Sequence, residues 1–270
     1  MTASKRSVGV IGAGAMGSSM IRGFLKAGLA RPQDLTASDP RKGALQELHK
    51  SVSVNITGDN TALAQRSEVV VIAVKPDQAP KVLQEIAPFI TLEHQVFSIA
   101  AGVSIAAIER HLPAGVSVIR AMPNVPALIG EGMTVLALGT NSGPEERESA
   151  EKLFSALGKV LTLKESDLDA VTGVSGCGPA YMAVVLEALA DGGVKMGLSR
   201  QVALDLAVQT MIGAARLIQI TGEHPASLKD RVCSPGGSTI SGVHVLENGG
   251  LRGLLISAVE ASTRRSRELQ

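Results

Sequence analysis

The sequence is poor in aromatic residues and in cysteine. Aromatic side chains make up only 2% of the 270 residues, and tryptophan is absent. Proteins that stack the bases of single-stranded nucleic acid need such side chains, so this class of function is disfavoured. The formal net charge of +1 gives no electrostatic reason for binding nucleic acid or a membrane surface. The two cysteines, Cys177 and Cys233, are too few for a disulfide framework and fit a reducing compartment.

The sequence shows no long apolar run and no metal-ligand pattern, and we expect no leader segment. No unbroken apolar run reaches the roughly 18 residues that a membrane span requires. The first strand is expected near Ser7, which leaves too few residues ahead of it for a signal or transit peptide. No spacing of His, Cys, Asp and Glu indicates a metal site. We therefore expect a cytoplasmic enzyme with no metal and with no nucleic-acid or membrane partner.

Strand and helix signals alternate over the first 164 residues. Apolar residues make up 45% of the chain and 29 residues are glycine, so the core must consist of small and branched aliphatic side chains. Residues 8–11 form a buried run, and Met20, Ile21 and Phe24 then recur at helical spacing. This alternation predicts an α/β fold in which residues 1–164 form a Rossmann-type, doubly wound and mostly parallel sheet. Further strands are expected at residues 35–38, 68–74, 95–100, 116–121, 133–138 and 159–163, with a charged helix at 144–157.

The strand signal ends after Ser166. Helices are expected at residues 179–192, 199–221, 235–248 and from 251 to the end, and several are apolar around much of their circumference. Such helices must be buried, either in a bundle or against another subunit. We therefore predict that residues 165–270 form an all-helical domain that carries a dimer interface.

A glycine-rich motif follows the first strand and opens the first helix. It reads Gly12-Ala13-Gly14-Ala15-Met16-Gly17, and in this position it predicts a dinucleotide site. Gly12 permits the tight turn, Gly14 lets the pyrophosphate approach the backbone, and Gly17 lets the helix pack close to the sheet.

The residues after the second strand leave the cofactor open between NADH and NADPH. Asp39 lies 22 positions after Gly17, where an acid accepts the ribose hydroxyls of NAD and repels the 2′-phosphate of NADP. Arg41 and Lys42 act in the opposite direction because both bind phosphate. Two further loops, Ala73-Val74-Lys75-Pro76 and residues 98–102, follow strands of the parallel sheet and should flank the cofactor.

A loop at residues 233–240 predicts a site for a small anion. Ser234 suits an N-cap, Pro235 suits the first helical position, and two glycines keep bulk away from the turn. The free N–H groups of such a helix start bind a small carboxylate or phosphate. The loop contains no strong acid or base.

Taken together, these segments resemble pyrroline-5-carboxylate reductase. The match also rests on three more specific segments, namely Arg120-Ala121-Met122-Pro123-Asn124-Val125-Pro126, Gly173-Val174-Ser175-Gly176-Cys177-Gly178-Pro179-Ala180-Tyr181 and residues 230–247. The resemblance implies NAD(P)H-dependent reduction of the cyclic imine Δ1-pyrroline-5-carboxylate to L-proline, the last step of proline biosynthesis. It also implies a Rossmann domain, a helical domain that interlocks with a partner, and dimers that often assemble further.

The resemblance assigns roles to individual residues. Thr239 should be the catalytic residue, hydrogen-bonding the ring nitrogen of the substrate. Relatives commonly carry Ser where Cys177 stands, and often Ser in place of Asp39 when they accept a 2′-phosphate. The expected substrate-binding residues are Ser234, Gly236, Gly237, Ser238 and Cys177, with the backbone of Thr239. The expected cofactor-binding residues are Gly12, Gly14, Ala15, Met16, Gly17, Ser38, Asp39, Asn60, Ala73, Val74, Lys75, Pro76, Ala100, Ala101 and Gly102.

Imine reduction suits a loop without acids or bases. A protonated imine is already an electrophile, so the protein mainly has to position it beside the nicotinamide. A β-hydroxyacid dehydrogenase, the nearest alternative, carries a Lys in a G-x-x-x-K-x-x-N pattern that is absent here. A non-catalytic NAD(P)-binding protein is the other alternative, but it has no need of a substrate loop such as residues 233–240.

Overall fold

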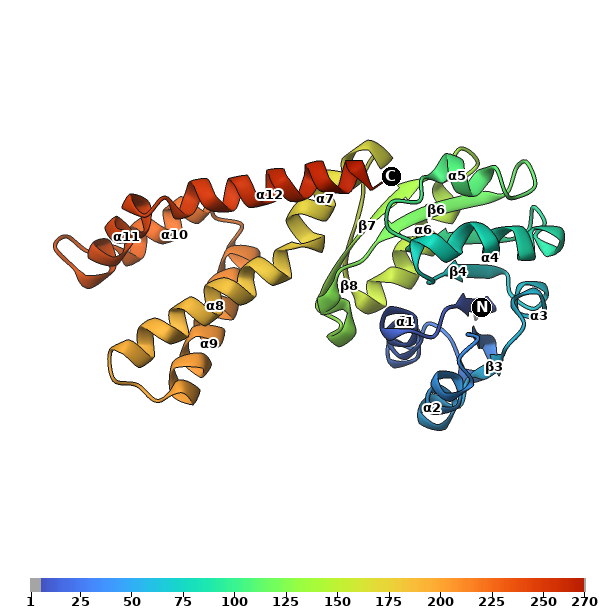
Figure 1. Ribbon diagram of the computed structural model, residues 1–270, viewed down its shortest axis with the longest axis horizontal. Helices are drawn as coiled ribbons and strands as arrows, with labels where there is room; N and C mark the ends of the chain where they lie inside the picture. Colours follow the sequence, from blue (N-terminus) through green and yellow to red (C-terminus); the bar gives the residue numbers. More distant parts are fainter. Residues whose placement is uncertain (1–5, 270) are drawn as a thin grey trace. The chain divides into compact units, whose positions relative to one another are not determined.

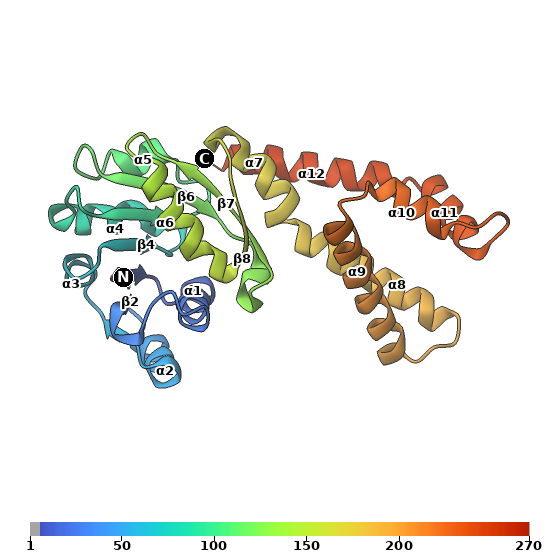
Figure 2. The same cartoon turned by 180° about the vertical axis from the view of Figure 1, so that it is seen from behind.

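The computed structural model describes residues 6–269, and the chain forms two compact units (Figures 1 and 2). The Rossmann unit comprises residues 6–176 together with the last residues of the described chain, 262–269. The helical unit comprises Cys177–Ala261.

The Rossmann unit is built on a sheet that has eight strands within the described residues, in the order β3-β2-β1-β4-β5-β6-β7-β8. Neighbouring strands are parallel except for the antiparallel pair β6 and β7. Val8 of β1 lies opposite Leu35 of β2 on one side and Val69 of β4 on the other. The chain therefore adds β2 and β3 on one side of β1 and then crosses to the other side, where it adds β4 and the later strands. The predicted doubly wound, mostly parallel sheet is confirmed. The strands are β1 Val8–Ile11, β2 Leu35–Ser38, β3 Asn55–Thr57, β4 Val69–Ile72, β5 Gln95–Ser98, β6 Ser117–Met122, β7 Gly132–Leu138 and β8 Gly158–Thr162.

Two layers of helices cover the two faces of this sheet. Helices α1, α2 and α6 pack on one face, and α3, α4 and α5 pack on the other. Because side chains alternate along a strand, Val69 and Val71 of β4 contact the first layer, and Val70 and Ile72 contact the second. Each of these four side chains is at most 2% exposed, and burying one contributes about 1.5–3 kcal/mol. The helices are α1 Ala15–Lys26, α2 Lys42–Val52, α3 Asn60–Gln65, α4 Ala79–Ile86, α5 Ile105–Glu109, α6 Pro144–Phe154 and α7 Leu168–Val171.

The helical unit has very little core of its own. Its buried hydrophobic residues, among those described, are Ala190, Ala203 and Ala207, at the crossing of α8 and α9. The close approach depends on Gly193, where an added Cβ would lie 2.8 Å from the Cβ of Ala203. The helices are α8 Gly178–Lys195, α9 Arg200–Thr221, α10 Pro225–Val232, α11 Ser238–Asn248 and the part of α12 (Leu251–Glu268) that ends at Ala261.

The apolar surface of these helices is extensive. Two stretches, Glu165–Lys195 and Arg200–Thr221, are long and apolar enough to cross a membrane by length and composition, although neither contains a long unbroken apolar run. Only 11% of the apolar window is buried in each. Helices that are apolar around much of their circumference and exposed in one chain are those expected to pack against another subunit.

Several elements differ from the predicted secondary structure or were not predicted. The helix predicted to start at Pro235 starts at Ser238, because Pro235 and Gly236 form a turn in which Gly236 has a φ of +67°. Strand β3 was not predicted because it has only three residues and no apolar run. Helix α10 was not predicted either; the His224 side chain caps it by accepting a hydrogen bond from the N–H of Ala226.

Candidate functional site

A cleft of about 770 Å³ opens where β1, β2 and β4 end, and we call it the strand-end cleft. Ligands of open parallel sheets bind outside the carboxyl ends of the strands, next to the point where the strand order reverses. The volume lies within the range of roughly 300–1,000 Å³ that small-molecule sites occupy. The cleft is lined by Ile11, Gly12, Gly14, Ala15, Met16, Ser38, Asp39, Pro40, Arg41, Gly58, Asn60, Ala73, Val74, Lys75, Gln78, Lys81, Val82 and Glu85.

The glycines of the motif are needed for steric reasons that differ from one to the next. Gly12 has a φ of +109°, and an added Cβ there would lie 2.5 Å from the carbonyl oxygen of Ala73. A Cβ on Gly17 would lie 1.9 Å from the carbonyl oxygen of Gly12. A Cβ on Gly14 would meet only one atom within 4 Å, the Arg41 Nη2 at 3.8 Å, so Gly14 leaves its space open toward the cleft. Helix α1 then begins with no acidic residue in its first turn and no side-chain cap, which suits a phosphate group.

Asp39 fastens the glycine-rich turn to the end of β2. Its Oδ2 accepts hydrogen bonds from the N–H of Ala13 at 2.9 Å and from Arg41 Nη2 at 2.9 Å. Its Oδ1 accepts from the backbone N–H and the Nε of Arg41, both at 2.9 Å. The Arg41 side chain, aided by the backbone N–H groups of Arg41 and Ala13, holds the pKa of this carboxyl below its ordinary value, although burial opposes the shift.

A series of side-chain hydrogen bonds also runs along the wall of the cleft. The Ser38 hydroxyl donates to Asn60 Oδ1 at 2.6 Å, and Asn60 Nδ2 donates to Glu85 Oε2 at 2.8 Å. Lys81 and Glu85 of α4 line the cleft but were not predicted as site residues. Their spacing of four residues puts them on one face of a helix that follows a predicted cofactor loop, which is the signal that could have revealed them.

Several predicted residues lie outside the lining of the cleft. Gly17 packs against the turn rather than lining the cleft, and Pro76 begins the short 3₁₀ helix Pro76–Gln78. Ala100, Ala101 and Gly102 follow β5, with Ala100 buried, Ala101 exposed and Gly102 at a φ of +75°. Their contacts with a cofactor stay predictions.

The segment that begins at Arg120 has a structural role, because its side chains hydrogen-bond to neighbouring loops. Arg120 is 5% exposed, and its Nη1 donates to Glu165 Oε1 at 3.0 Å. The same oxygen accepts from the N–H of Ile105 at 2.7 Å, which ties the start of α5 to β6. The side chain of Asn124 donates to the carbonyl oxygen of Ser175 and accepts from the N–H of Met133. These bonds hold the loops after β5 and β6 in place.

In the helical unit, residues 234–237 form a tight turn before α11. The N–H of Gly237 donates to the carbonyl oxygen of Ser234 at 3.0 Å, with Pro235 and the positive-φ Gly236 between them, as in a type II turn. Ser234 is therefore not the N-cap that was predicted; Gly237 takes that position. A Cβ on Gly237 would lie 2.5 Å from Ser234 Oγ and 3.1 Å from the Ser234 carbonyl oxygen, so a larger residue would force the Ser234 side chain to move.

The beginning of α11 leaves polar groups without partners inside the chain. Among the described residues, no intramolecular hydrogen bond reaches the hydroxyls of Ser234, Ser238 and Thr239 or the N–H groups of residues 238–240. The first turn holds no acidic residue. Hydroxyls and N–H groups of this kind, with the positive end of the helix dipole, favour a small carboxylate.

Cys177 is the residue before α8 and directly follows the π-helical segment Thr172–Gly176. Gly178 and Pro179 are the first two residues of this helix, which starts one residue before the predicted 179. Figures 1 and 2 show α10 and α11 at the end of the helical unit away from the beginning of α8. A single chain therefore does not bring the start of α8 beside the turn that precedes α11.

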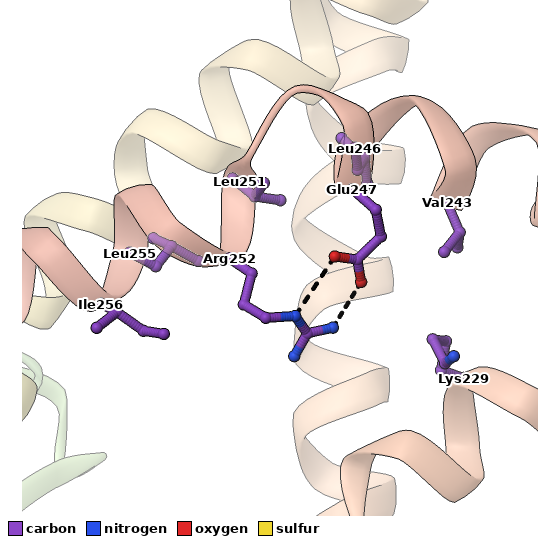
Figure 3. Close-up of a pocket in the computed structure, with 8 residues that line it drawn as sticks. All are labelled: Lys229, Val243, Leu246, Glu247, Leu251, Arg252, Leu255 and Ile256. Atoms are coloured by element: carbon purple, nitrogen blue, oxygen red, sulfur yellow. Dashed lines mark hydrogen bonds and ion pairs between the residues drawn. The ribbon is translucent and has the colours of Figure 1, made fainter.

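A second cavity, of about 490 Å³, lies within the helical unit (Figure 3). Most of its lining is apolar, and it includes Leu246 of α11 and Leu255 of α12. The charged groups at its rim are Lys229 and the ion pair in which Arg252 Nη2 donates to Glu247 Oε1 at 2.5 Å. Such a lining suits an apolar side chain better than an anionic substrate.

The strand-end cleft has the features that a nicotinamide dinucleotide requires. It combines the glycine turn, the uncapped start of α1 and three cations, namely Arg41, Lys75 and Lys81. The carboxylates in its lining are Asp39 and Glu85, and both are hydrogen-bonded to neighbouring side chains. The residues present therefore fit this cofactor.

Comparison with known proteins agrees with both units. Residues 165–269 match a family model described as pyrroline-5-carboxylate reductase dimerisation, and residues 7–102 match one described as NADP oxidoreductase coenzyme F420-dependent. Pyrroline-5-carboxylate reductase 2 of Macaca fascicularis is 46% identical over 269 residues, which cover 98% of this chain and 84% of that protein.

Solved structures give the same result over the whole chain. A pyrroline-5-carboxylate reductase from Coxiella burnetii superposes with a TM-score of 0.94 at 32% identity, covering 99% of both chains. The Plasmodium falciparum pyrroline carboxylate reductase with NADP bound has a TM-score of 0.87 at 32% identity, covering 98% of both chains. The chain therefore belongs to the pyrroline-5-carboxylate reductases, oxidoreductases that use NAD(P)H to reduce Δ1-pyrroline-5-carboxylate to L-proline.

Proposed function

We propose that the turn at residues 234–237 and the start of α11 hold the substrate of this reduction, and that the strand-end cleft holds the dinucleotide. The observation that carries the proposal is the set of unpartnered groups at the beginning of α11, namely three hydroxyls and the N–H groups of residues 238–240. Δ1-Pyrroline-5-carboxylate carries one carboxylate and one ring nitrogen. The N–H groups, with the Ser234 and Ser238 hydroxyls, suit the carboxylate. The Thr239 hydroxyl then suits the ring nitrogen.

The residues of the turn act by positioning the substrate rather than by acid–base chemistry. The bound nicotinamide supplies the hydride that reduces the C=N carbon. A hydroxyl is a poor general acid, so Thr239 holds the protonated nitrogen in place and the proton itself comes from solvent. The glycines at 236 and 237 leave no side chain over the substrate. This division of work needs no Lys or His in the turn, and residues 233–240 contain neither.

The remaining assignments follow the same division. We assign dinucleotide binding to residues 1–164 and substrate binding with dimerisation to residues 165–270. Gly236, Gly237 and Cys177 complete the proposed substrate residues, and a cysteine at 177 offers only a weak S–H donor there. The cofactor residues proposed are Gly12, Gly14, Ala15, Met16, Gly17, Ser38, Asp39, Asn60, Ala73, Val74, Lys75, Pro76, Ala100, Ala101 and Gly102.

The setting of the reaction is proposed as well. The apolar surface of the helical unit supports a homo-oligomer, because residues 165–269 match a dimerisation family and such surface is covered by a partner. We assign the enzyme to the cytoplasm, without membrane or nucleic-acid partners. The near-zero net charge supports the absence of the latter.

The proposal is tested with variants of Thr239. Thr239→Ala removes the hydroxyl and should lower kcat with Δ1-pyrroline-5-carboxylate about 10- to 100-fold, whereas Thr239→Ser should retain most of the rate. The rate is followed as oxidation of NADH and of NADPH. Ser241→Ala is the matched control, because the Ser241 hydroxyl already donates to the carbonyl oxygen of Gly237 within the helix. Rates near wild type for both Thr239 variants would remove Thr239 from the mechanism.

A further inference from the structure

The side chain of Arg41 is held in one orientation on the wall of the strand-end cleft. Its Nε and Nη2 donate to the two oxygens of Asp39, both at 2.9 Å, and its backbone N–H donates to Asp39 Oδ1. Paired donation of this kind fixes the plane of a guanidinium group. Asp39 is 5% exposed and the Arg41 side chain is 65% exposed, so a buried carboxylate anchors a cation that faces the cleft.

This pairing changes what Asp39 can do. An acid at the end of the second strand selects NAD when its oxygens are open to the ribose hydroxyls and its charge faces the 2′-position. Here both oxygens already accept two hydrogen bonds each, one of them from the N–H of Ala13. The charge of Asp39 is paired with Arg41 as well. The carboxylate is thus turned toward the protein and toward Arg41.

The surroundings of Arg41 favour an anion. Its Nη2 is the one atom near the open side of Gly14, so the guanidinium lies beside the glycine turn. Among the described residues, no intramolecular hydrogen bond uses its Nη1. Helix α2 begins at the next residue with no acid in its first turn, and Lys81 lies on the same cleft. Lys42, although adjacent in sequence, is not part of the cleft lining.

We infer that Arg41 recognises the 2′-phosphate of NADPH and that Asp39 is a positioning residue for Arg41, so that this enzyme prefers NADPH over NADH. The inference rests on the assignment of the strand-end cleft to the dinucleotide. It reverses the effect expected of an acid after the second strand. Removing the charge of Asp39 should weaken NADPH use rather than improve it, because Arg41 loses the partner that orients it.

Binding and kinetics on the whole enzyme test the inference together. Calorimetric titration compares adenosine 2′,5′-bisphosphate with adenosine 5′-monophosphate, which differ by the 2′-phosphate alone. Arg41→Ala should weaken binding of the bisphosphate about 10- to 100-fold and leave the monophosphate unchanged. The kcat/KM for NADPH should fall by the same factor, with that for NADH unchanged. Lys50→Ala is the matched control, because it removes a positive charge at the far end of α2, outside the cleft lining, and should alter neither ligand.

Asp39→Asn tests the positioning role. It should lower the affinity for the bisphosphate about 3- to 10-fold, less than Arg41→Ala, because the guanidinium remains but is no longer held. It should keep the monophosphate affinity within a factor of about two. A rise in the NADPH-to-NADH ratio of kcat/KM in Asp39→Asn would overturn the positioning role, as would equal losses with both ligands.

The failure of this inference and the failure of the cleft assignment give different results. Equal effects of Arg41→Ala on both fragments would overturn the inference while leaving the cleft as the cofactor site. If neither fragment bound the wild-type enzyme while pyrroline reduction proceeded, the cleft assignment itself would be wrong.

Discussion

The Rossmann unit and the helical unit bury their apolar side chains in opposite ways. In the Rossmann unit, aliphatic side chains are buried on both faces of one sheet, and those of β4 are at most 2% exposed. In the helical unit, among the described residues, the buried hydrophobic side chains are three alanines. Large apolar residues such as Leu206 and Ile220 are instead 56% and 80% exposed in a single chain.

This difference indicates where each unit obtains its stability. A core of branched aliphatics between two helix layers stabilises the Rossmann unit within one chain. Three buried alanines, together with half-buried side chains such as Leu186, are a small apolar core against the conformational entropy of ordering 85 residues, at roughly 1–2 kcal/mol for each backbone residue. The helical unit therefore depends on apolar contacts with another subunit, in agreement with the dimerisation family that its sequence matches. Damage to one unit should leave the other recognisably intact.

The largest effect is expected from Leu206→Asp in α9. Leu206 is 56% exposed in one chain, so the substitution disturbs the single chain little but places a charge on the apolar surface of the helical unit. An unpaired charge buried at an interface costs about 3 kcal/mol or more, which weakens association at least about 100-fold. Light scattering over a range of protein concentrations measures the effect. Leu206→Met keeps the surface apolar and should assemble normally. An assembly unchanged by Leu206→Asp would mean that this face of α9 is not buried in the oligomer.

Gly17→Ala should have a smaller effect and act on the other unit. Its Cβ would lie 1.9 Å from the carbonyl oxygen of Gly12, so α1 must move away from the sheet. Overpacking of this kind costs about 1–3 kcal/mol of unfolding free energy. Denaturant unfolding with light scattering should show a less stable Rossmann unit in an intact oligomer.

Gly43→Ala in α2 is the control for Gly17→Ala. No atom lies within 4 Å of its added Cβ, and alanine there should stabilise the helix by about 0.4–1 kcal/mol. A loss of stability equal to that of Gly17→Ala would show that the cost comes from glycine replacement in general and not from the turn.

The sequence predicted the Rossmann unit more completely than the helical unit, for a physical reason. Runs such as residues 8–11 and the glycines at 12, 14 and 17 are local patterns whose meaning depends on nearby residues alone. The start of α11 was misplaced because Ser234 and Pro235 match both a helix cap and a turn. The φ of +67° at Gly236, which decides between them, is not visible in the sequence. Helix α10 carried a start signal in His224 and Pro225, but the same residues are typical of a turn.

The sequence named many of the residues that line the strand-end cleft, but not the pairings between them. Asp39 and Arg41 were both recognised from the sequence as acting on the cofactor, in opposite directions. Their mutual hydrogen bonds depend on side-chain rotamers and on the backbone of the turn after β2, which composition and spacing do not specify. Lys81 and Glu85 reach the cleft through the packing of α4 against the sheet, which is also a tertiary property.

The smallest effect is expected from the Asp39–Arg41 pair on the acid stability of the Rossmann unit. The pKa of Asp39 is lowered in the folded protein, chiefly by the hydrogen bond from the Arg41 side chain. A carboxyl with a lowered pKa stabilises the folded state above its unfolded pKa of about 3.9, and this stabilisation is lost as the pH falls through the lower folded value. Because the Arg41 side chain is 65% exposed, solvent screens the pair and its contribution to stability should be small. The unfolding free energies of wild type and Asp39→Asn should therefore differ by a constant amount from about pH 8 to pH 5, and the difference should shrink only below about pH 4. Denaturant unfolding at several pH values measures this. A difference that stays constant below about pH 4 would mean that Asp39 titrates alike in the folded and unfolded states, and the ion pair would then contribute nothing to this unit.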